Sequence, residues 1–227
     1  MNKSNPGHGG LSALPWPRWI VLPIFAAIAA LAVHQTYAWW PLADHGPAAL
    51  ETTLKEEALL ISTLLRGGER VKTAQIVMDA TYKAMFVAPG LQSLLDRKPP
   101  PTENLRTVVE TPAQAVKPVL RSIAASVQII GLRLGMVAAT LPVFLLAGLA
   151  AIADGILIRH RRRLAVEPSR GFVYHRAKAI HRFLAGALLF LYLAPWFPTD
   201  PRWILPPFAL GLSATLWVGV AYFKKYL

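Results

Sequence analysis

The sequence predicts an all-α integral membrane protein with four transmembrane helices and an extracytoplasmic helical segment between the first and the second. Of its 227 residues 54% are apolar, and the formal net charge is +12. Apolar runs of about 20 residues, the length that crosses a bilayer core, alternate with short clusters of Lys and Arg. Because short basic loops stay in the cytoplasm, these clusters predict a multi-pass membrane protein with both termini cytoplasmic.

The first apolar run is predicted to anchor the chain. Residues 1–18, rich in Gly and Pro, are expected to form a disordered cytoplasmic tail. Residues 19–40 contain no Asp, Glu, Lys or Arg and are predicted as transmembrane helix 1. Trp39 and Trp40 at its end are typical of a membrane interface, which favours a retained anchor over the alternative, a cleaved signal peptide.

Residues 41–132 are predicted to form an extracytoplasmic, amphipathic-helical segment. Three apolar stripes at helical spacing run through it, and breaks at Gly67-Gly68, Pro89-Gly90 and residues 99–101 separate them. The third stripe leads directly into the next apolar run, so the two are expected to form one long helix that Pro112 and Pro118 kink or interrupt. The alternative is that these helices lie flat on the membrane surface.

The C-terminal half is predicted to contain three more spans. Transmembrane helix 2 is expected at 133–158, a basic cytoplasmic loop at 159–182, helix 3 at 183–197, helix 4 at 203–223 and a cytoplasmic tail at 224–227. Small residues at four-residue spacing are expected to let helices approach closely. They are Gly135, Ala139, Ala147, Ala151 and Gly155 in helix 2, and Gly211, Thr215 and Gly219 in helix 4.

Asp154 is the only acid within a predicted span, and ionisable residues inside membranes are candidates for transport. A small transporter that uses Asp154 with His34 is therefore the alternative function. The position of Asp154, about one turn from the cytoplasmic end, favours a structural pairing with Arg159 or Arg163. The two halves also lack the inverted repeat that is typical of transporters.

Sequence motifs for catalysis and cofactor binding are absent. The chain has no cysteine, no His/Glu metalloprotease spacing, no nucleophile elbow and no phosphate-binding glycine loop. We therefore expect a non-enzymatic protein without catalytic residues, cofactor or metal.

The basic loop is the candidate docking site. A loop that only fixes topology needs charge, but this one also contains an aromatic patch, which favours packing on a protein partner or on the bundle itself. The arginines are expected to face the anionic inner leaflet, direct nucleic-acid binding is less favoured, and a homo-oligomer stays open. The candidate docking residues are Arg159, Arg161, Arg162, Arg163, Phe172, Tyr174, His175, Arg176 and Lys178.

Three motifs carry a family resemblance: Ala153-Asp154-Gly155 with the arginines after it, residues 171–178 (GFVYHRAK), and residues 223–227 (FKKYL). They resemble the inner-membrane protein family of integrative conjugative elements and conjugative plasmids, which has a domain of unknown function and is encoded beside a TraD-like coupling ATPase. The resemblance is sharpest over residues 134–227. It implies a bacterial inner-membrane accessory protein of conjugative DNA transfer by a type IV secretion apparatus, with the coupling ATPase as partner, and it brings no catalytic residues.

Overall fold

A computed structural model describes residues 18–40, 46–64, 68–96, 112–164 and 171–223. These residues form helices and no strand, which confirms the all-α prediction. The tails at 1–17 and 224–227 and the prolines at 99–101 lie outside the described residues. The elements are α1 (Arg18–Ala38), α2 (Gly46–Leu64), α3 (Glu69–Tyr82), the π-helical turn η1 (Lys83–Val87), α4 (Leu91–Asp96), α5 (Pro112–Leu164), α6 (Gly171–Leu193) and α7 (Pro201–Ala221).

The longest element is α5, whose 53 residues extend about 80 Å at 1.5 Å per residue. The third amphipathic stripe and the following apolar run therefore form one continuous helix, as expected. The expected interruption by proline is wrong. Pro112 begins the helix, where a missing N–H costs least, and Pro118 in the second turn removes only one backbone hydrogen bond.

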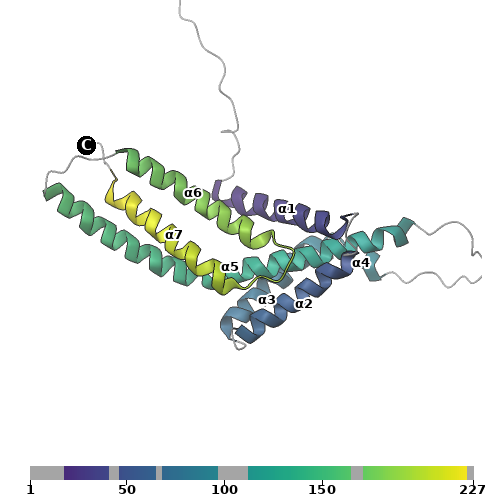
Figure 1. Cartoon of the computed structure of the whole chain (residues 1–227). Helices are drawn as coiled ribbons and strands as arrows, with labels where there is room; N and C mark the ends of the chain where they lie inside the picture. Colours follow the sequence, from purple (N-terminus) through teal and green to yellow (C-terminus); the bar gives the residue numbers. More distant parts are fainter. Residues whose placement is uncertain (1–17, 41–45, 65–67, 97–111, 165–170, 224–227) are drawn as a thin grey trace, which may run out of the picture.

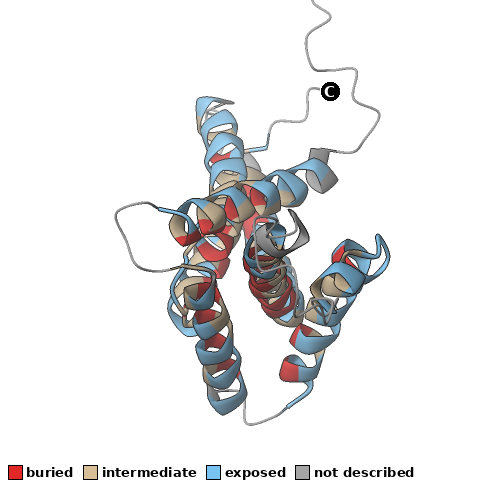
Figure 2. Ribbon diagram, turned by 90° about the vertical axis from the view of Figure 1, so that its right-hand side faces the viewer, coloured by how far each residue is buried: buried red, intermediate tan, exposed pale blue. Residues whose placement is uncertain are grey.

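The other helices pack along α5. In the view of Figure 1, α1 and α6 lie above α5, and α2 and α3 lie below it. Helices α5 and α7 run in the same direction, because Met136 and Leu205 share one core cluster while Gly155 meets Trp217 and Val220 further along. Helix α6 runs in the opposite direction, and α7 lies between α6 and α5 (Figure 1). Figure 2 shows that the buried residues follow the faces that the helices turn toward one another.

The stripes of α2 and α3 are covered by α5. Ile61 and the α3 residues Val71 and Ala74 form a core cluster with Leu132 and Met136 of α5. The apolar stripes of α2 and α3 therefore face α5. At the end of α3, the wider turn of η1 shifts the register, so that Phe86 is 1% exposed while its neighbour Met85 is 49% exposed.

Three helices, not the four expected, are long and apolar enough to cross a membrane within the described residues. They are α1 over Val21–Ala38, α5 within Val116–Arg162 and α7 over Pro201–Ala221. Helix α6 does not qualify, because its first half carries Arg176, Lys178 and Arg182. The prediction of four spans is therefore corrected to three candidates.

The predicted boundaries after Asp154 also change. The expected loop at 159–182 is helical at both ends, since α5 continues to Leu164 and α6 begins at Gly171. The span expected at 183–197 is the second half of α6, which ends at Leu193. The physical reason is that Arg and Lys are good helix formers, and no proline interrupts the sequence from residue 143 to residue 167.

Helix α1 is displaced along α5 relative to α7. Leu22 lies against Gly186 in the middle of α6, and the indole of Trp39 donates to Ser122 Oγ at 3.4 Å. Ser122 precedes Arg133 on α5 by 11 residues, or about 16 Å, and the α6–α7 connection lies at the level of Arg133. The end of α1 therefore extends beyond the helical hairpin of α6 and α7.

Candidate functional site

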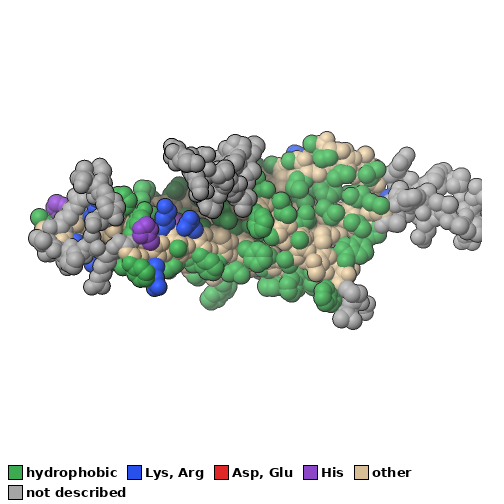
Figure 3. Space-filling model, turned by 90° about the horizontal axis from the view of Figure 1, so that it is seen from above, with side chains coloured by type: hydrophobic (Ala, Val, Ile, Leu, Met, Phe, Trp, Pro, Cys, Tyr) green, Lys and Arg blue, Asp and Glu red, His purple; other side chains and the backbone are tan. Residues whose placement is uncertain are grey.

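The predicted docking residues gather where α5 ends, α6 begins and α7 ends. On the face that Figure 3 shows, Lys, Arg and His side chains lie toward this end, and hydrophobic side chains cover the middle of the molecule. We call this region, which comprises Arg159–Arg163, residues 171–178 and Tyr222–Phe223, the basic end. The side chains of Arg163 and Gly171 lie outside the described part.

Arginine–aromatic contacts join the three helices at the basic end. The guanidinium of Arg159 lies 5.3 Å from the ring centroid of Phe223, and that of Arg162 lies 3.9 Å from the ring of Tyr222. The rings of Tyr174 and Phe223 meet edge to face at 5.5 Å. Such contacts contribute about 0.5–2 kcal/mol each. These predicted docking residues therefore hold the bundle's own end together.

A second group of predicted docking residues faces outward. Phe172 is 65% exposed, and the guanidinium of Arg176 lies 4.3 Å from its ring centroid. Arg161, His175 and Lys178 are exposed as well. None of these basic side chains forms an ion pair among the described residues. The basic end thus has two parts. Aromatic contacts join its helices internally, and an outward surface is formed by Phe172 with the basic side chains of Arg161, His175, Arg176 and Lys178.

Asp154 is hydrogen-bonded to a neighbouring helix. The indole Nε1 of Trp217 on α7 donates to Asp154 Oδ2 at 2.7 Å, whereas the sequence suggested pairing with Arg159 or Arg163. His34 lies elsewhere, with Nε2 at 3.1 Å from the carbonyl oxygen of Pro195, at the level of Arg133. Arg133 and Asp154 are 21 residues apart on α5, about 30 Å, so the structure does not bring Asp154 and His34 together.

The rows of small residues meet different neighbours. A methyl group on Gly135 would lie 2.5 Å from Ala74 Cα, so α3 approaches α5 most closely there. At Gly155 the corresponding distance, to Trp217 O on α7, is 3.0 Å. Ala139, Ala147 and Ala151 are half-buried on α5. On α7, Gly211 faces Leu184, the Thr215 hydroxyl lies 2.9 Å from His181 Nδ1, and Gly219 has open space around it.

The most extensive polar cluster is one that the sequence analysis missed. Arg133 and Glu57 form a fully buried ion pair, with Nε to Oε1 at 2.8 Å and Nη2 to Oε2 at 2.6 Å. The guanidinium also donates to the carbonyl oxygens of Leu193, Pro195 and Phe197, at 3.1, 2.6 and 2.9 Å. All five of its N–H groups are used.

This cluster stabilises the connection between α6 and α7, residues 194–200. His34 contacts the Pro195 carbonyl, and Thr53 Oγ1 donates to the Trp196 carbonyl at 3.0 Å, so α1 and α2 hold the same segment as Arg133. Burial raises the pKa of the Glu57 carboxyl, while the hydrogen bonds and charge of Arg133 act in the opposite direction. The sequence contained one signal for this cluster. Thr53 and Glu57 are polar residues on the same apolar stripe as Leu50 and Ile61, which indicates that they are buried.

The family comparison agrees with the resemblance seen in the sequence. A model of the family described as IncC plasmid conjugative DNA transfer protein DtrJ-like matches residues 39–224. The chain belongs to this DtrJ-like family. The DtrJ-like match covers α2 to α7, including both the Arg133 cluster and the basic end, and begins one residue after α1. Membership of the DtrJ-like family implies a role in conjugative DNA transfer. No curated protein and no solved structure matches the chain.

Proposed function

We propose that the chain is a non-enzymatic inner-membrane accessory protein of a conjugative type IV secretion apparatus. It docks a protein component of that apparatus through the outward surface of its basic end, and the coupling ATPase is the expected partner. The observation that carries this proposal is the exposed Phe172–Arg176 pair, surrounded by basic side chains that form no ion pair within the described part of the chain, in a member of a conjugative DNA-transfer family.

The membrane orientation follows from the distribution of charge. Arg159–Arg163, Arg176 and Lys178 lie at one end of the bundle, which the positive-inside rule assigns to the cytoplasm. Helix α7 ends there beside Arg159 and Arg162, so the C-terminus is cytoplasmic. Since α5 and α7 run in the same direction, α6 runs antiparallel to both and returns the chain from the basic end. Helix α1 begins on the side of the basic end, with its N-terminus toward the cytoplasm.

The outward surface has the composition of a binding hot spot. Aromatic and Arg side chains dominate the binding energy at protein interfaces, whereas scattered rim charges contribute little. Phe172, His175 and Arg176 offer one exposed ring and two basic groups on consecutive turns of α6. The expected contact surface on the partner is therefore acidic with an apolar pocket. Tyr174, Arg159 and Arg162 keep the three helix ends in place behind this surface.

Transport through Asp154 and His34 has less support. The two side chains lie about 30 Å apart along α5, and each is hydrogen-bonded to an adjacent element. The absence of hydrolase and phosphate-binding motifs from the sequence supports the non-enzymatic part of the proposal.

Site-specific photocrosslinking tests the docking proposal. A photoreactive amino acid replaces Phe172 in cells that carry the native conjugative element, and the matched control replaces Phe183, which is 72% exposed on the same helix. We expect position 172 to crosslink the coupling ATPase or another transfer component, and position 183 to yield lipid adducts only. Crosslinks from position 172 that reach only lipid, DNA or a second copy of the chain would contradict docking.

The paired variant Phe172→Ala with Arg176→Ala measures the strength of the contact. We expect the co-purified transfer component to fall about tenfold, since removal of one hot-spot cluster costs at least about 1–2 kcal/mol. Phe183→Ala is the control and leaves the amount unchanged.

A further inference from the structure

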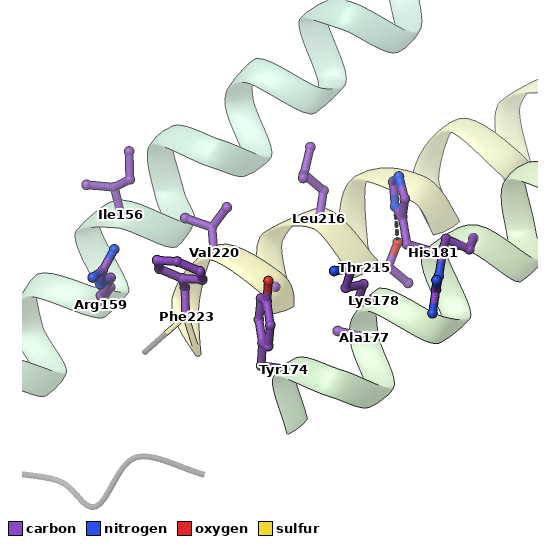
Figure 4. A pocket seen from close by; sticks show the side chains of 12 residues that line it. Ile156, Arg159, Tyr174, Ala177, Lys178, His181, Thr215, Leu216, Val220 and Phe223 are labelled. Carbon is purple, nitrogen blue, oxygen red and sulfur yellow. Dashed lines mark hydrogen bonds between the residues drawn. The ribbon is translucent and has the colours of Figure 1, made fainter. Parts of the chain in front are cut away.

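A pocket of about 560 Å³ lies between α5, α6 and α7 just inside the basic end. Figure 4 shows Arg159 entering it from α5, Tyr174, Lys178 and His181 from α6, and Leu216, Val220 and Phe223 from α7. This volume is in the range of pockets that hold small ligands or part of a larger one.

The pocket is lined by both basic and apolar side chains. Arg159, Lys178, His181 and Arg182 line it, and no Asp or Glu among the described residues does. Among the described residues, Arg159, Lys178 and Arg182 form no ion pair, and His181 is held by its contact with the Thr215 hydroxyl at 2.9 Å. The apolar part of the lining consists of Ile156, Leu216, Val220 and Phe223, and Arg159 lies beside Ile156 and Phe223 (Figure 4).

The depth of these charges requires an explanation. Lys178 and Arg182 share the pocket with Thr215 and Gly219, which lie within the apolar stretch of α7 rather than beyond its end. A cation beside a membrane-spanning helix is costly unless it reaches water or pairs with an anion. An anion in the pocket would satisfy several cations at once, and an attached apolar chain would cover the wall on α5 and α7.

We propose that this pocket binds one anionic phospholipid of the surrounding leaflet. Its phosphate lies among Arg159, Lys178 and Arg182, and the first part of an acyl chain lies against Ile156, Leu216 and Val220. Charge complementarity selects the phosphate, and the apolar wall selects a lipid over a free anion. The site lies between α5, α6 and α7, whereas Phe172 and Arg176 lie outside it; Lys178 is exposed and belongs to both regions.

Native mass spectrometry of the full chain in mild detergent tests this assignment. The chain is titrated with phosphatidylglycerol or with phosphatidylcholine, and bound lipids are counted. We expect one tightly held phosphatidylglycerol and no comparable phosphatidylcholine. The double change Lys178→Gln with Arg182→Gln should weaken that binding about tenfold or more. The control pair Arg161→Gln with Arg176→Gln removes the same charge at the same end of the bundle, outside this pocket, and should leave binding within about twofold.

A second variant leaves every charge in place. A Cβ added at Gly219 meets no neighbouring atom within 4 Å, and Gly219 lines the pocket, so Gly219→Leu places additional apolar atoms in it. It should also reduce phosphatidylglycerol binding. Equal losses in the two charge pairs would overturn the proposal, because they would indicate diffuse surface attraction. Displacement of the lipid by millimolar inorganic phosphate would overturn it too, because the site would then recognise a bare anion.

Discussion

At the scale of single residues, Arg133 explains how α6 can end inside the protein. The last carbonyl groups of a helix have no partner within it, and a buried carbonyl without a partner costs free energy. Arg133 donates to three carbonyl groups at the end of α6 and in the segment after it, while Glu57 balances its charge. A positive charge at this end also interacts favourably with the helix dipole.

Replacing Arg133 should therefore be among the most damaging single changes. In Arg133→Gln, three carbonyl groups lose their donor and Glu57 is left as an unpaired buried acid, so we expect a loss of about 3–5 kcal/mol in stability. Glu57→Gln keeps an oxygen acceptor for the guanidinium and should cost less, about 1–3 kcal/mol. Thermal unfolding in mild detergent measures both.

Arg70→Gln provides the control, because Arg70 is exposed on α3. Its unfolding midpoint should equal that of the unchanged protein. The structural role of Arg133 would be refuted if Arg133→Gln unfolded at the same temperature as this control.

The side-chain partners of individual residues were harder to predict from the sequence than the helices were. Arg133 stood at the boundary of a predicted span and Glu57 on an amphipathic stripe, 76 residues apart, and nothing in the local pattern pairs them. Their pairing depends on how α2 lies on α5. Likewise, Asp154 was noticed, but its partner Trp217 lies 63 residues further along the chain.

At the scale of elements, the contact between α3 and α5 depends on the absence of side chains. Gly135 allows the backbone of α3 at Ala74 to approach so closely that even a methyl group would overlap it. Gly131, one turn earlier, would place a methyl group 3.0 Å from Met78 Cα. The apolar stripe of α3 is covered because of this approach.

Gly135→Ala should separate α3 from α5 and destabilise the protein by about 1–3 kcal/mol, the usual cost of overpacking. Gly219→Ala is the matched control, since it has open space and alanine favours a helix by about 0.5–1 kcal/mol over glycine. Thermal unfolding compares the two. Equal midpoints for both variants would mean that α3 moves away at little cost.

The helices themselves were largely predictable, because apolar stripes and Gly or Pro breaks are local. The stripes containing Leu50 and Val71 correspond to α2 and α3, and the continuous helix through residue 133 was expected. The prediction of a loop was wrong at Arg159–Arg163 and at Arg176, which are helical. A cluster of positive charge predicts the side of the membrane on which a segment lies, and it does not predict the secondary structure of that segment. The aromatic patch was noticed, but the sequence could not separate Tyr174, which packs on Phe223, from the exposed Phe172.

At the scale of the whole molecule, the proposed orientation predicts which residues face each compartment. The chain contains no cysteine, so a single introduced cysteine reports one position. In intact spheroplasts, a membrane-impermeant maleimide should label Leu59→Cys on α2 and leave Phe172→Cys unlabelled until the membrane is permeabilised; both side chains are 65% exposed.

Leu146→Cys is the control for lipid exposure. Leu146 is 69% exposed on α5 within the candidate span, so the reagent should label it in neither condition. Labelling of Phe172→Cys in intact spheroplasts would invert the orientation and exclude a cytoplasmic partner at the basic end.

The continuity of α5 has a mechanical consequence. The same rod that carries Arg133 and the packing surface for α3 ends in the arginines of the basic end, with no loop between them. A tilt of about 10° around its midpoint would swing each end by about 7 Å in opposite directions, given its length of about 80 Å. Engagement of a partner at one end of α5 would thus displace the other end as well, less any bending at Pro142, where the helix lacks one backbone hydrogen bond.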